Sequence, residues 1–291
     1  MICSICQGPM NRLFAHQDYW ILGCEVCHHR AAEIEPCANH VGRIYDDEYF
    51  EGGGAGYADY LSEAGLLRSH GQKYARLLAR YMKPGTMLDV GAAAGFLLKG
   101  FLDQGWRGEG IEPNPRMAEH ARKHLGLDVM TGTLEQFESE GQYDLVSMIQ
   151  VIAHFVDPQR ALRVAAERTR DGGYWLIETW NRESWTARAF GQQWHEYSPP
   201  SVLHWFSPEG LNRLAAQFGF REIARGRPSK WIGGGHARSL LRYRLEGSRV
   251  GRFFAGAVGL IPERLALPYP AEDLFWTLYQ KYSPQRHGDE K

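Results

Sequence analysis

The sequence lacks an excess of charge of either sign: 33 lysines and arginines stand against 34 aspartates and glutamates, a formal net charge of −1. A nucleic-acid-binding protein usually carries a basic surface that neutralises phosphates, so we do not expect a nucleic-acid partner. No apolar run approaches the roughly 20 residues that a membrane-spanning helix needs. The first four residues show neither the basic nor the apolar segment of a secretory signal peptide. We therefore expect a cytoplasmic protein that has no membrane partner.

Cysteine is also scarce, with five residues in 291, which argues against a disulfide framework. Four of these cysteines form two Cys-x2-Cys pairs: Cys3 with Cys6, and Cys24 with Cys27. Two such pairs, separated by a hairpin-sized segment, can place four thiolates tetrahedrally around zinc. Such a site has no open coordination position, so we predict a structural, zinc-ribbon-like module over residues 1–35. Free thiols in a metal-free lobe are the alternative, and Cys37 with His40 is interpreted as a loop pair.

A glycine cluster, Gly52 to Gly54, lies among many tyrosines in the next segment, residues 36–70. Clusters of this kind are typical of connections rather than of regular elements. We interpret this segment as a linker and lid, in which Tyr57 and Tyr60 are candidates to close over a bound ligand.

From residue 71 the apolar pattern becomes regular. It predicts strands at 87–91, up to 112, near 128–130, at 143–149, at 174–178, after 220 and at 274–279. It predicts helices at 74–81, 96–102, 116–125, 158–170 and 208–218. Strands that alternate with helices over short connections are typical of a parallel, doubly wound α/β sheet. We therefore predict one α/β domain over residues 71–291, with an aromatic insertion at 179–206 and a C-terminal excursion at 229–270.

The segment Leu88–Leu98 is predicted as a strand, a tight loop of small residues and the start of a helix. In a doubly wound sheet, a ligand lies beyond the carboxyl ends of the strands, where this loop sits. Ala93 occupies a position where the usual glycine pattern has glycine. Glu112 ends the next strand about 20 residues downstream, where a carboxylate can accept hydrogen bonds from both ribose hydroxyls. Together these features predict a nucleotide-containing cofactor and leave NAD open, with a structural turn and a surface glutamate as the alternative.

Several motifs in residues 71–225 resemble those of class I S-adenosylmethionine-dependent methyltransferases of the bacterial type 11/type 23 kind. They are Asp89–Gly95 (first motif), Glu112–Asn114 (ribose turn), Thr131–Leu134 with Phe137 (adenine segment), Gln150–Pro158 (motif after the fourth strand) and Trp194–Leu211 (substrate-side loop and helix). Two departures from the family pattern occur, since Ala153 replaces a usual glutamate and the adenine segment lacks its frequent aspartate.

This resemblance implies a Rossmann-like, seven-stranded methyltransferase sheet with S-adenosylmethionine as its cofactor. The residues that it implies for cofactor binding are Asp89, Gly91, Ala93, Gly95, Phe96, Glu112, Pro113, Thr133, Leu134, Gln150 and Val151.

Three histidines are candidates for a catalytic base. Methyl transfer is an in-line displacement, so an enzyme must align its acceptor and deprotonate it when it is a hydroxyl or an amine. His154 follows the predicted fourth strand, and a neutral imidazole suits that task. His195 and His204 lie in the aromatic insertion and are the runner-up bases. The alternative is that these histidines and aromatic residues pack as ordinary core.

The balanced charge and the aromatic insertion favour a small-molecule acceptor: a sugar, a nucleotide-sugar or a natural-product intermediate. A four-cysteine lobe before a class I core is also similar to the sugar C-methyltransferases. An RNA methyltransferase that grips RNA with its zinc module is an alternative, but Arg12 and Arg30 are the only lysines or arginines among the first 40 residues. A non-catalytic, cofactor-binding partner protein is a third possibility. The acceptor atom and the oligomeric state do not follow from the sequence.

Overall fold

The computed structural model of the protein describes residues 1–34, 40–51, 59–137, 141–229, 231–235, 237–238, 262, 265–268 and 271–282. Cys37, Gly52–Gly54 and Tyr57 lie outside the described residues, as does most of the excursion between 239 and 264. Among the described residues, no helix combines the length and the apolar character needed to cross a bilayer.

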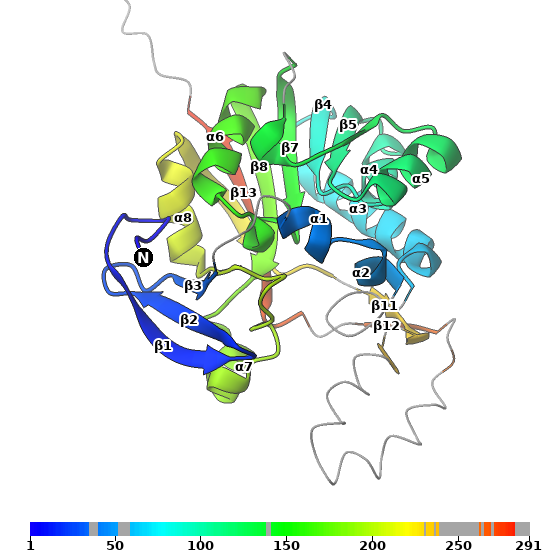
Figure 1. Ribbon diagram of the computed structural model, residues 1–291. Helices are drawn as coiled ribbons and strands as arrows, with labels where there is room; N and C mark the ends of the chain where they lie inside the picture. The colour runs from blue at the N-terminus through cyan, green and yellow to red at the C-terminus, as the bar shows by residue number, and fades with distance from the viewer. Residues whose placement is uncertain are drawn as a thin grey trace, which may run out of the picture.

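A seven-stranded sheet forms the centre of the molecule, in the order β10-β13-β8-β7-β4-β5-β6 (Figure 1). Its strands are β4 (Thr86–Val90), β5 (Arg107–Glu112), β6 (Val129–Thr131), β7 (Tyr143–Ile149), β8 (Thr169–Trp180), β10 (Phe220–Gly226) and β13 (Leu274–Lys281). The five strands from β6 to β8 are parallel, whereas β13 runs antiparallel to both neighbours. This arrangement confirms the predicted Rossmann-like sheet.

Helices cover both faces of the sheet, which explains why its central strands are largely apolar. On one face lie α3 (Ala64–Leu78), α4 (Phe96–Leu102) and α5 (Pro115–Leu125), and on the other lie α6 (Pro158–Arg168) and α8 (Pro208–Ala216). Along β7, Leu145 packs toward the first group of helices, whereas Val146 and Met148 pack toward the second, and all three are fully buried.

Three of these helices begin with the same local signal. Asn114, Asp157 and Ser207 precede a proline and accept a hydrogen bond from the backbone amide three residues on, at 2.9, 3.0 and 3.0 Å. A polar N-cap followed by proline satisfies an orphan amide and presets the first helical φ angle. The starts of α5, α6 and α8 are therefore fixed locally by the sequence.

The N-terminal lobe forms a second sheet that the main domain completes. Its strands β1 (Met10–His16), β2 (Tyr19–Cys24) and β3 (Arg30–Glu33) are followed at the edge by β9 (His204–Trp205), which comes from the aromatic insertion. The lobe lies beside α7 (Trp185–Phe190) and α8 in Figure 1. The lobe and the aromatic insertion therefore share one sheet, which joins the lobe to the main domain.

Short elements fill the remaining described segments. In the predicted linker, α1 (His40–Ile44), α2 (Asp47–Glu51) and the 3-10 turn η1 (Leu61–Glu63) precede α3. Three further 3-10 turns are η2 (Leu134–Gln136), η3 (Ile152–His154) and η4 (Gly191–Gln193). In the C-terminal excursion, β11 (Trp231–Gly233) pairs with β12 (Ala266–Pro268) in antiparallel fashion.

Candidate functional site

A cavity of about 310 Å³ opens at the carboxyl edge of the central sheet. The last residues of four neighbouring parallel strands line it, including Asp89 from β4, Glu112 from β5, Ile149 from β7 and Glu178 from β8. This is the edge at which doubly wound sheets bind their ligands. Nine of the eleven residues predicted to bind the cofactor line the cavity: Asp89, Gly91, Ala93, Glu112, Pro113, Thr133, Leu134, Gln150 and Val151.

The other two predicted residues, Gly95 and Phe96, do not line the cavity, but their packing fixes the shape of the loop. Phe96 is buried and stacks on Tyr60, with 5.9 Å between the ring centroids. Gly95 has φ 81°, and a Cβ atom there would approach the Leu127 side chain to 2.6 Å. A side chain at this position would thus be both strained and crowded.

Ala93 adopts the left-handed conformation that glycine would adopt at the same place, with φ 46°. Its amide donates a hydrogen bond of 2.8 Å to Oε2 of Glu112. The carboxylate of the next strand therefore stabilises a turn that alanine adopts reluctantly. This contact explains how the loop keeps its form without the middle glycine of the family pattern.

Two of the residues predicted to bind the cofactor are buried carboxylic acids. Glu112 is 3 % exposed, and its two oxygens accept the amides of Ala93 and Asn114, each at 2.8 Å. Burial raises the pKa of Glu112 to about 7, although the two amides oppose the shift. Burial likewise raises the pKa of Asp89 to about 7, against the hydroxyl of Ser147, which donates to Oδ1 at 2.6 Å.

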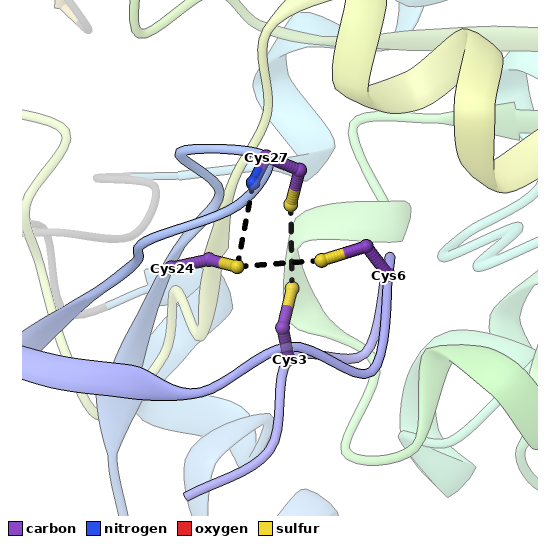
Figure 2. Close-up of side chains that lie close together, drawn as sticks. All are labelled: Cys3, Cys6, Cys24 and Cys27. Atoms are coloured by element: carbon purple, nitrogen blue, oxygen red, sulfur yellow. Dashed lines mark hydrogen bonds between the residues drawn. The ribbon is translucent and has the colours of Figure 1, made fainter.

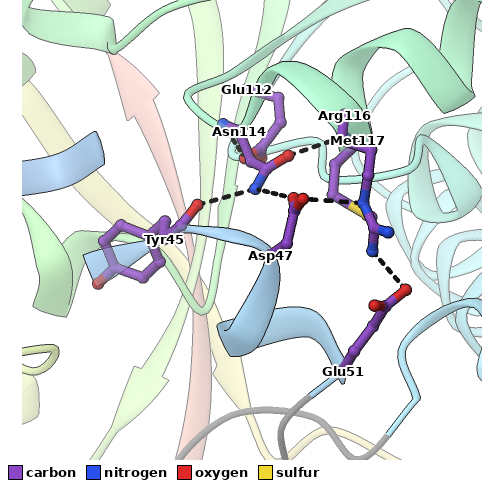
Figure 3. A network of polar contacts seen from close by, with 7 residues as sticks. All are labelled: Tyr45, Asp47, Glu51, Glu112, Asn114, Arg116 and Met117. Atoms are coloured by element: carbon purple, nitrogen blue, oxygen red, sulfur yellow. Dashed lines mark hydrogen bonds and ion pairs between the residues drawn. The ribbon is translucent and has the colours of Figure 1, made fainter. Parts of the chain in front are cut away.

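The segment from α1 to α2 covers the ribose turn, and sequence reasoning did not identify its contacts. Asn114 Nδ2 donates to the Tyr45 carbonyl at 2.9 Å and to Oδ1 of Asp47 at 3.3 Å (Figure 3). Arg116 forms ion pairs with Asp47, at 3.2 Å, and with Glu51. Tyr45, Tyr49, Phe50 and Tyr60 line the cavity from this side. The only signal in the sequence was the density of tyrosines.

His154 lies at the cavity on η3, with its ring held by two neighbours. Its Nδ1 is 2.7 Å from the Tyr45 hydroxyl and 2.7 Å from the Ser201 carbonyl, and the same hydroxyl donates to that carbonyl at 2.9 Å. This pattern assigns the proton to Nδ1 and leaves the lone pair on Nε2. Burial lowers the pKa of His154, while the carbonyls of Ser201 and Gln150 oppose the shift, so the ring is neutral near pH 7.

The two runner-up histidines have different surroundings. His195 lines the cavity, and its Nε2 lies 2.9 Å from Oε1 of Glu196. His204 does not line the cavity: its Nδ1 is 3.2 Å from Nε2 of His29, and its Nε2 is 3.1 Å from the Phe155 carbonyl. Burial lowers the pKa of His204 to about 4. His204 thus packs between the N-terminal lobe and the main domain and is poorly placed to deprotonate an acceptor.

The aromatic insertion contributes both core and cavity wall. Four of its aromatic residues are at most 2 % exposed: Trp194, Tyr197, Trp205 and Phe206. The first three pack with Phe14 and Ile21 of the N-terminal lobe. Trp180, Glu196, Ser198 and Ser201 instead face the cavity, so only part of the insertion is available to a substrate.

A buried carboxylate that the sequence analysis did not single out lies at the end of β8. Glu178 accepts hydrogen bonds from the Tyr74 hydroxyl and, at 2.7 Å, from Gln150 Nε2, and it lies 3.2 Å from Nε2 of His70. Like Asp89 and Glu112, it is an acidic residue at the carboxyl end of an apolar strand, and that position could have identified it.

The four cysteine sulfurs converge in the N-terminal lobe (Figure 2). Cys3 and Cys27 are 3.5 Å apart at their sulfurs, and Cys6 and Cys24 are 3.3 Å apart. A tetrahedral zinc ion with bonds of about 2.3 Å places its sulfur ligands nearly 4 Å from one another, so this set can hold one.

Backbone amides donate hydrogen bonds to the sulfurs of two of these cysteines, although burial still raises the pKa of Cys3 to about 11. The Ile5 amide donates to Cys3 Sγ at 3.3 Å, and the Val26 amide donates to Cys24 Sγ at 3.4 Å. Burial would raise the pKa of the Cys24 thiol, but amide hydrogen bonds outweigh it and lower the pKa to about 7. Since metals bind thiolates, the donor chemistry fits the ion as well as the geometry does.

Comparison with known proteins places these features in a family context. The family described as "Methyltransferase domain" matches residues 63–224. A ubiquinone biosynthesis O-methyltransferase of Bradyrhizobium sp. is 32% identical over 131 residues, which cover 43% of this chain and 49% of that protein. A protein of the same name from Methylocella silvestris is 32% identical over 145 residues, covering 48% and 54%. The chain thus spans about half the length of the curated relatives it matches.

Solved structures show the same fold. A methyltransferase of Thermotoga maritima, titled a possible histamine N-methyltransferase, has 21% identity and a TM-score of 0.50, covering 76% of this chain and 94% of its own. A methyltransferase of Archaeoglobus fulgidus has 16% identity and a TM-score of 0.50, covering 76% and 99%. At these identities the likeness concerns the fold alone.

Proposed function

Because the chain belongs to the methyltransferase-domain family and is a class I S-adenosylmethionine-dependent methyltransferase, we propose that it methylates a small molecule such as a sugar, a nucleotide-sugar or a natural-product intermediate. The relatives named as O-methyltransferases favour a hydroxyl oxygen as the acceptor atom.

One observation carries this proposal: the cavity continues past the cofactor loop. Its lining follows the strand order, from Glu112 on β5 and Thr133 after β6, past His154 after β7, to Trp180 at the end of β8, and includes His195 and Ser198 of the insertion. A cavity with an apolar wall and a few convergent polar groups is typical of a small-molecule site. We assign the first end to the cofactor and the second to the acceptor.

At the cofactor end, Glu112 would accept the ribose hydroxyls in its ionised form. The backbone of Gly91 to Ala93 would lie along the methionine part, where small side chains permit a close approach. Thr133 and Leu134 would flank the adenine. Bound S-adenosylmethionine would supply an electrophilic methyl group at the boundary between the two ends.

At the acceptor end, we assign His154 as the base. Its neutral Nε2 would accept the acceptor proton, and the resulting imidazolium would be stabilised by the Ser201 carbonyl at Nδ1. The Tyr45 hydroxyl fixes the ring in this orientation. His195 is the second candidate for the base.

We further propose that the four cysteines bind a structural zinc ion. With all four positions of the ion occupied by sulfur, its role would be to hold the lobe, whose small size leaves it a limited core of its own. The side chains of Gln159 on α6 and Gln217 beyond α8 donate to the carbonyls of Ser4 and Ile5. These contacts would join the first zinc knuckle to the main domain.

The proposal is tested by calorimetric titration with S-adenosylmethionine and S-adenosylhomocysteine. The zinc content of the protein is measured first. We expect micromolar binding that is lost in Glu112→Ala and kept in Glu119→Ala, whose exposed carboxylate on α5 pairs with Lys123. A screen of hydroxylated acceptors would follow. Absence of cofactor binding by folded, zinc-loaded protein would refute the proposed function.

A further inference from the structure

Three potential metal ligands meet beside the acceptor end of the cavity, which the first two line: His195, Glu196 and Asp273. His195 Nε2 lies 2.9 Å from Oε1 of Glu196 and 3.7 Å from Oδ2 of Asp273, and all three atoms lie within 4.8 Å of one another. We propose that these side chains bind a divalent cation, distinct from the four-cysteine site, and that this cation orients the acceptor.

The spacing of the three atoms suits a six-coordinate ion. Two bonds of about 2.1 Å at a right angle place their ligand atoms about 3 Å apart. Of the two separations measured from the histidine nitrogen, the one to Glu196, 2.9 Å, matches that value, and the one to Asp273, 3.7 Å, exceeds it. Rotation of the side chains would be needed to bring the Asp273 oxygen to the same spacing.

The charge of the cluster also favours a cation. The Asp273 side chain is 4 % exposed and that of Glu196 is 13 % exposed. In the part of the chain that the structure describes, the imidazole of His195 is the only basic group within ion-pair distance of either carboxylate. Two poorly hydrated carboxylates beside one imidazole are an unfavourable arrangement unless further positive charge is bound.

Two hydrogen bonds hold Asp273 in place, as is usual for a carboxylate that binds a metal ion. The indole nitrogen of Trp194, which is fully buried, donates to Oδ2 of Asp273 at 3.0 Å, and the Asn181 amide donates to its carbonyl at 2.6 Å. Hydrogen bonds from outside the coordination shell orient metal-binding carboxylates in this way. The residue also directly precedes β13, so its backbone is anchored in the central sheet.

The position of the cluster points to the class of acceptor, and this step rests on the proposed function. His195 and Glu196 line the same cavity as His154 and the cofactor loop. Three protein ligands leave coordination positions for two adjacent oxygens of an acceptor, as in a vicinal diol. Coordination lowers the pKa of a hydroxyl, so the cation would assist deprotonation while His154 accepts the proton.

Electron paramagnetic resonance with Mn²⁺ tests the site on the full-length, zinc-loaded protein. We expect one Mn²⁺ to bind per chain, with affinity reduced about tenfold or more in Asp273→Asn and in Glu196→Gln. The control is Glu272→Gln, because Glu272 is adjacent in sequence and accepts the amides of Trp185 and Thr186, at 3.1 and 3.0 Å, outside the cluster. Failure of the wild-type protein to bind Mn²⁺, or equal binding by all variants, would overturn the proposal.

The acceptor class is tested with catechol as a vicinal-diol probe and phenol as its one-hydroxyl control. In the presence of S-adenosylhomocysteine, we expect catechol but not phenol to change the Mn²⁺ spectrum. An unchanged spectrum would overturn the role of the cation in orienting the acceptor. Cofactor calorimetry on the same samples separates the two proposals, because Mn²⁺ binding without cofactor binding would reject only the methyl-transfer role. It also checks that the variants remain folded.

Discussion

Glu112 joins the cofactor loop to the ribose turn through its two amide contacts, and its proton affinity has a measurable effect on stability. Its pKa is raised by burial from 4.5 to about 7. Between these values the folded, unliganded protein holds a proton that the unfolded chain has released. The contribution of Glu112 to the free energy of unfolding therefore falls as the pH rises through this window.

The substitution Glu112→Gln removes this titration. We expect the free energy of unfolding of the wild type, relative to that of the variant, to fall by on the order of 3 kcal/mol between pH 4.5 and 7. Urea denaturation at several pH values measures this difference. A difference that stays constant with pH would show that Glu112 is already ionised in the folded protein.

The base assignment is tested with two variants, His154→Ala and Tyr45→Phe. We expect His154→Ala to lower kcat by about 10²- to 10⁴-fold, the usual range for loss of a general base, with little change in cofactor affinity. Tyr45→Phe should have a smaller effect, since it removes only the hydroxyl beside Nδ1. Single-turnover methyl transfer to an acceptor from the screen measures both. If His154→Ala left kcat unchanged, His195 would be assigned as the base instead.

At the scale of elements, the close packing of α3 against α4 depends on two glycines. A Cβ atom at Gly71 would lie 2.2 Å from the Leu97 carbonyl oxygen, and one at Gly100 would lie 2.2 Å from that of Arg68. Backbone atoms cannot rotate away, so any side chain here forces the two helices apart. Because α3 carries His70 and Tyr74 to Glu178, their separation would also disturb the wall of the cavity.

We expect Gly71→Ala to destabilise the protein by about 1–3 kcal/mol, as overpacked core substitutions do. Gly65→Ala is a matched control in the same helix, since nothing lies within 4 Å of a Cβ atom there, and its better helix propensity should leave stability unchanged or slightly higher. Chemical denaturation compares the two. Equal effects would mean that helix propensity, and not helix packing, determines the result.

The elements that local signals specify were predicted well. The helix 96–102 and the strand 143–149 have the predicted bounds. The predicted start of β8 was wrong, since the sequence predicted a helix over 158–170 and a strand only from 174. The strand instead begins at Thr169, pairs there with Tyr143 across an irregular register, and accommodates Gly172 at φ 75°.

The candidate site was predictable where it depends on strand ends and unpredictable where it depends on distant contacts. Asp89 and Glu112 lie at the carboxyl ends of apolar strands, so their place at the cavity follows from the topology. The contact of Tyr45 with Asn114 joins residues 69 positions apart, and that of Trp194 with Asp273 joins residues 79 positions apart. No periodicity or propensity encodes such pairings.

At the scale of the whole molecule, the N-terminal lobe supports the wall of the acceptor end. Ala32 donates its amide to the Leu203 carbonyl, and the Leu203 amide donates to the Ala153 carbonyl, both at 2.9 Å. A continuous chain of backbone hydrogen bonds thus runs from the lobe to the turn that holds His154. Disturbing the lobe should therefore loosen the site without contact with any ligand.

Removal of the proposed zinc ion tests this connection. We expect chelation, or the substitution Cys24→Ser, to lower Tm by several degrees and to increase hydrogen exchange at β9 and η3 while β4 and β5 stay protected. Mass spectrometry of exchanged peptides measures the pattern. Protection of β9 that does not depend on metal would indicate that the lobe folds on its own packing.

The shared sheet also has a consequence for biosynthesis. His29 of the lobe and His204 of β9 are 175 residues apart in the chain. At roughly 5–20 residues per second, the ribosome delivers the fourth strand about 10–35 s after the first three. During that interval the edge of β3 has no partner, and all four cysteines have already emerged. Early capture of a metal ion would protect the nascent lobe from mispairing and oxidation until its last strand arrives.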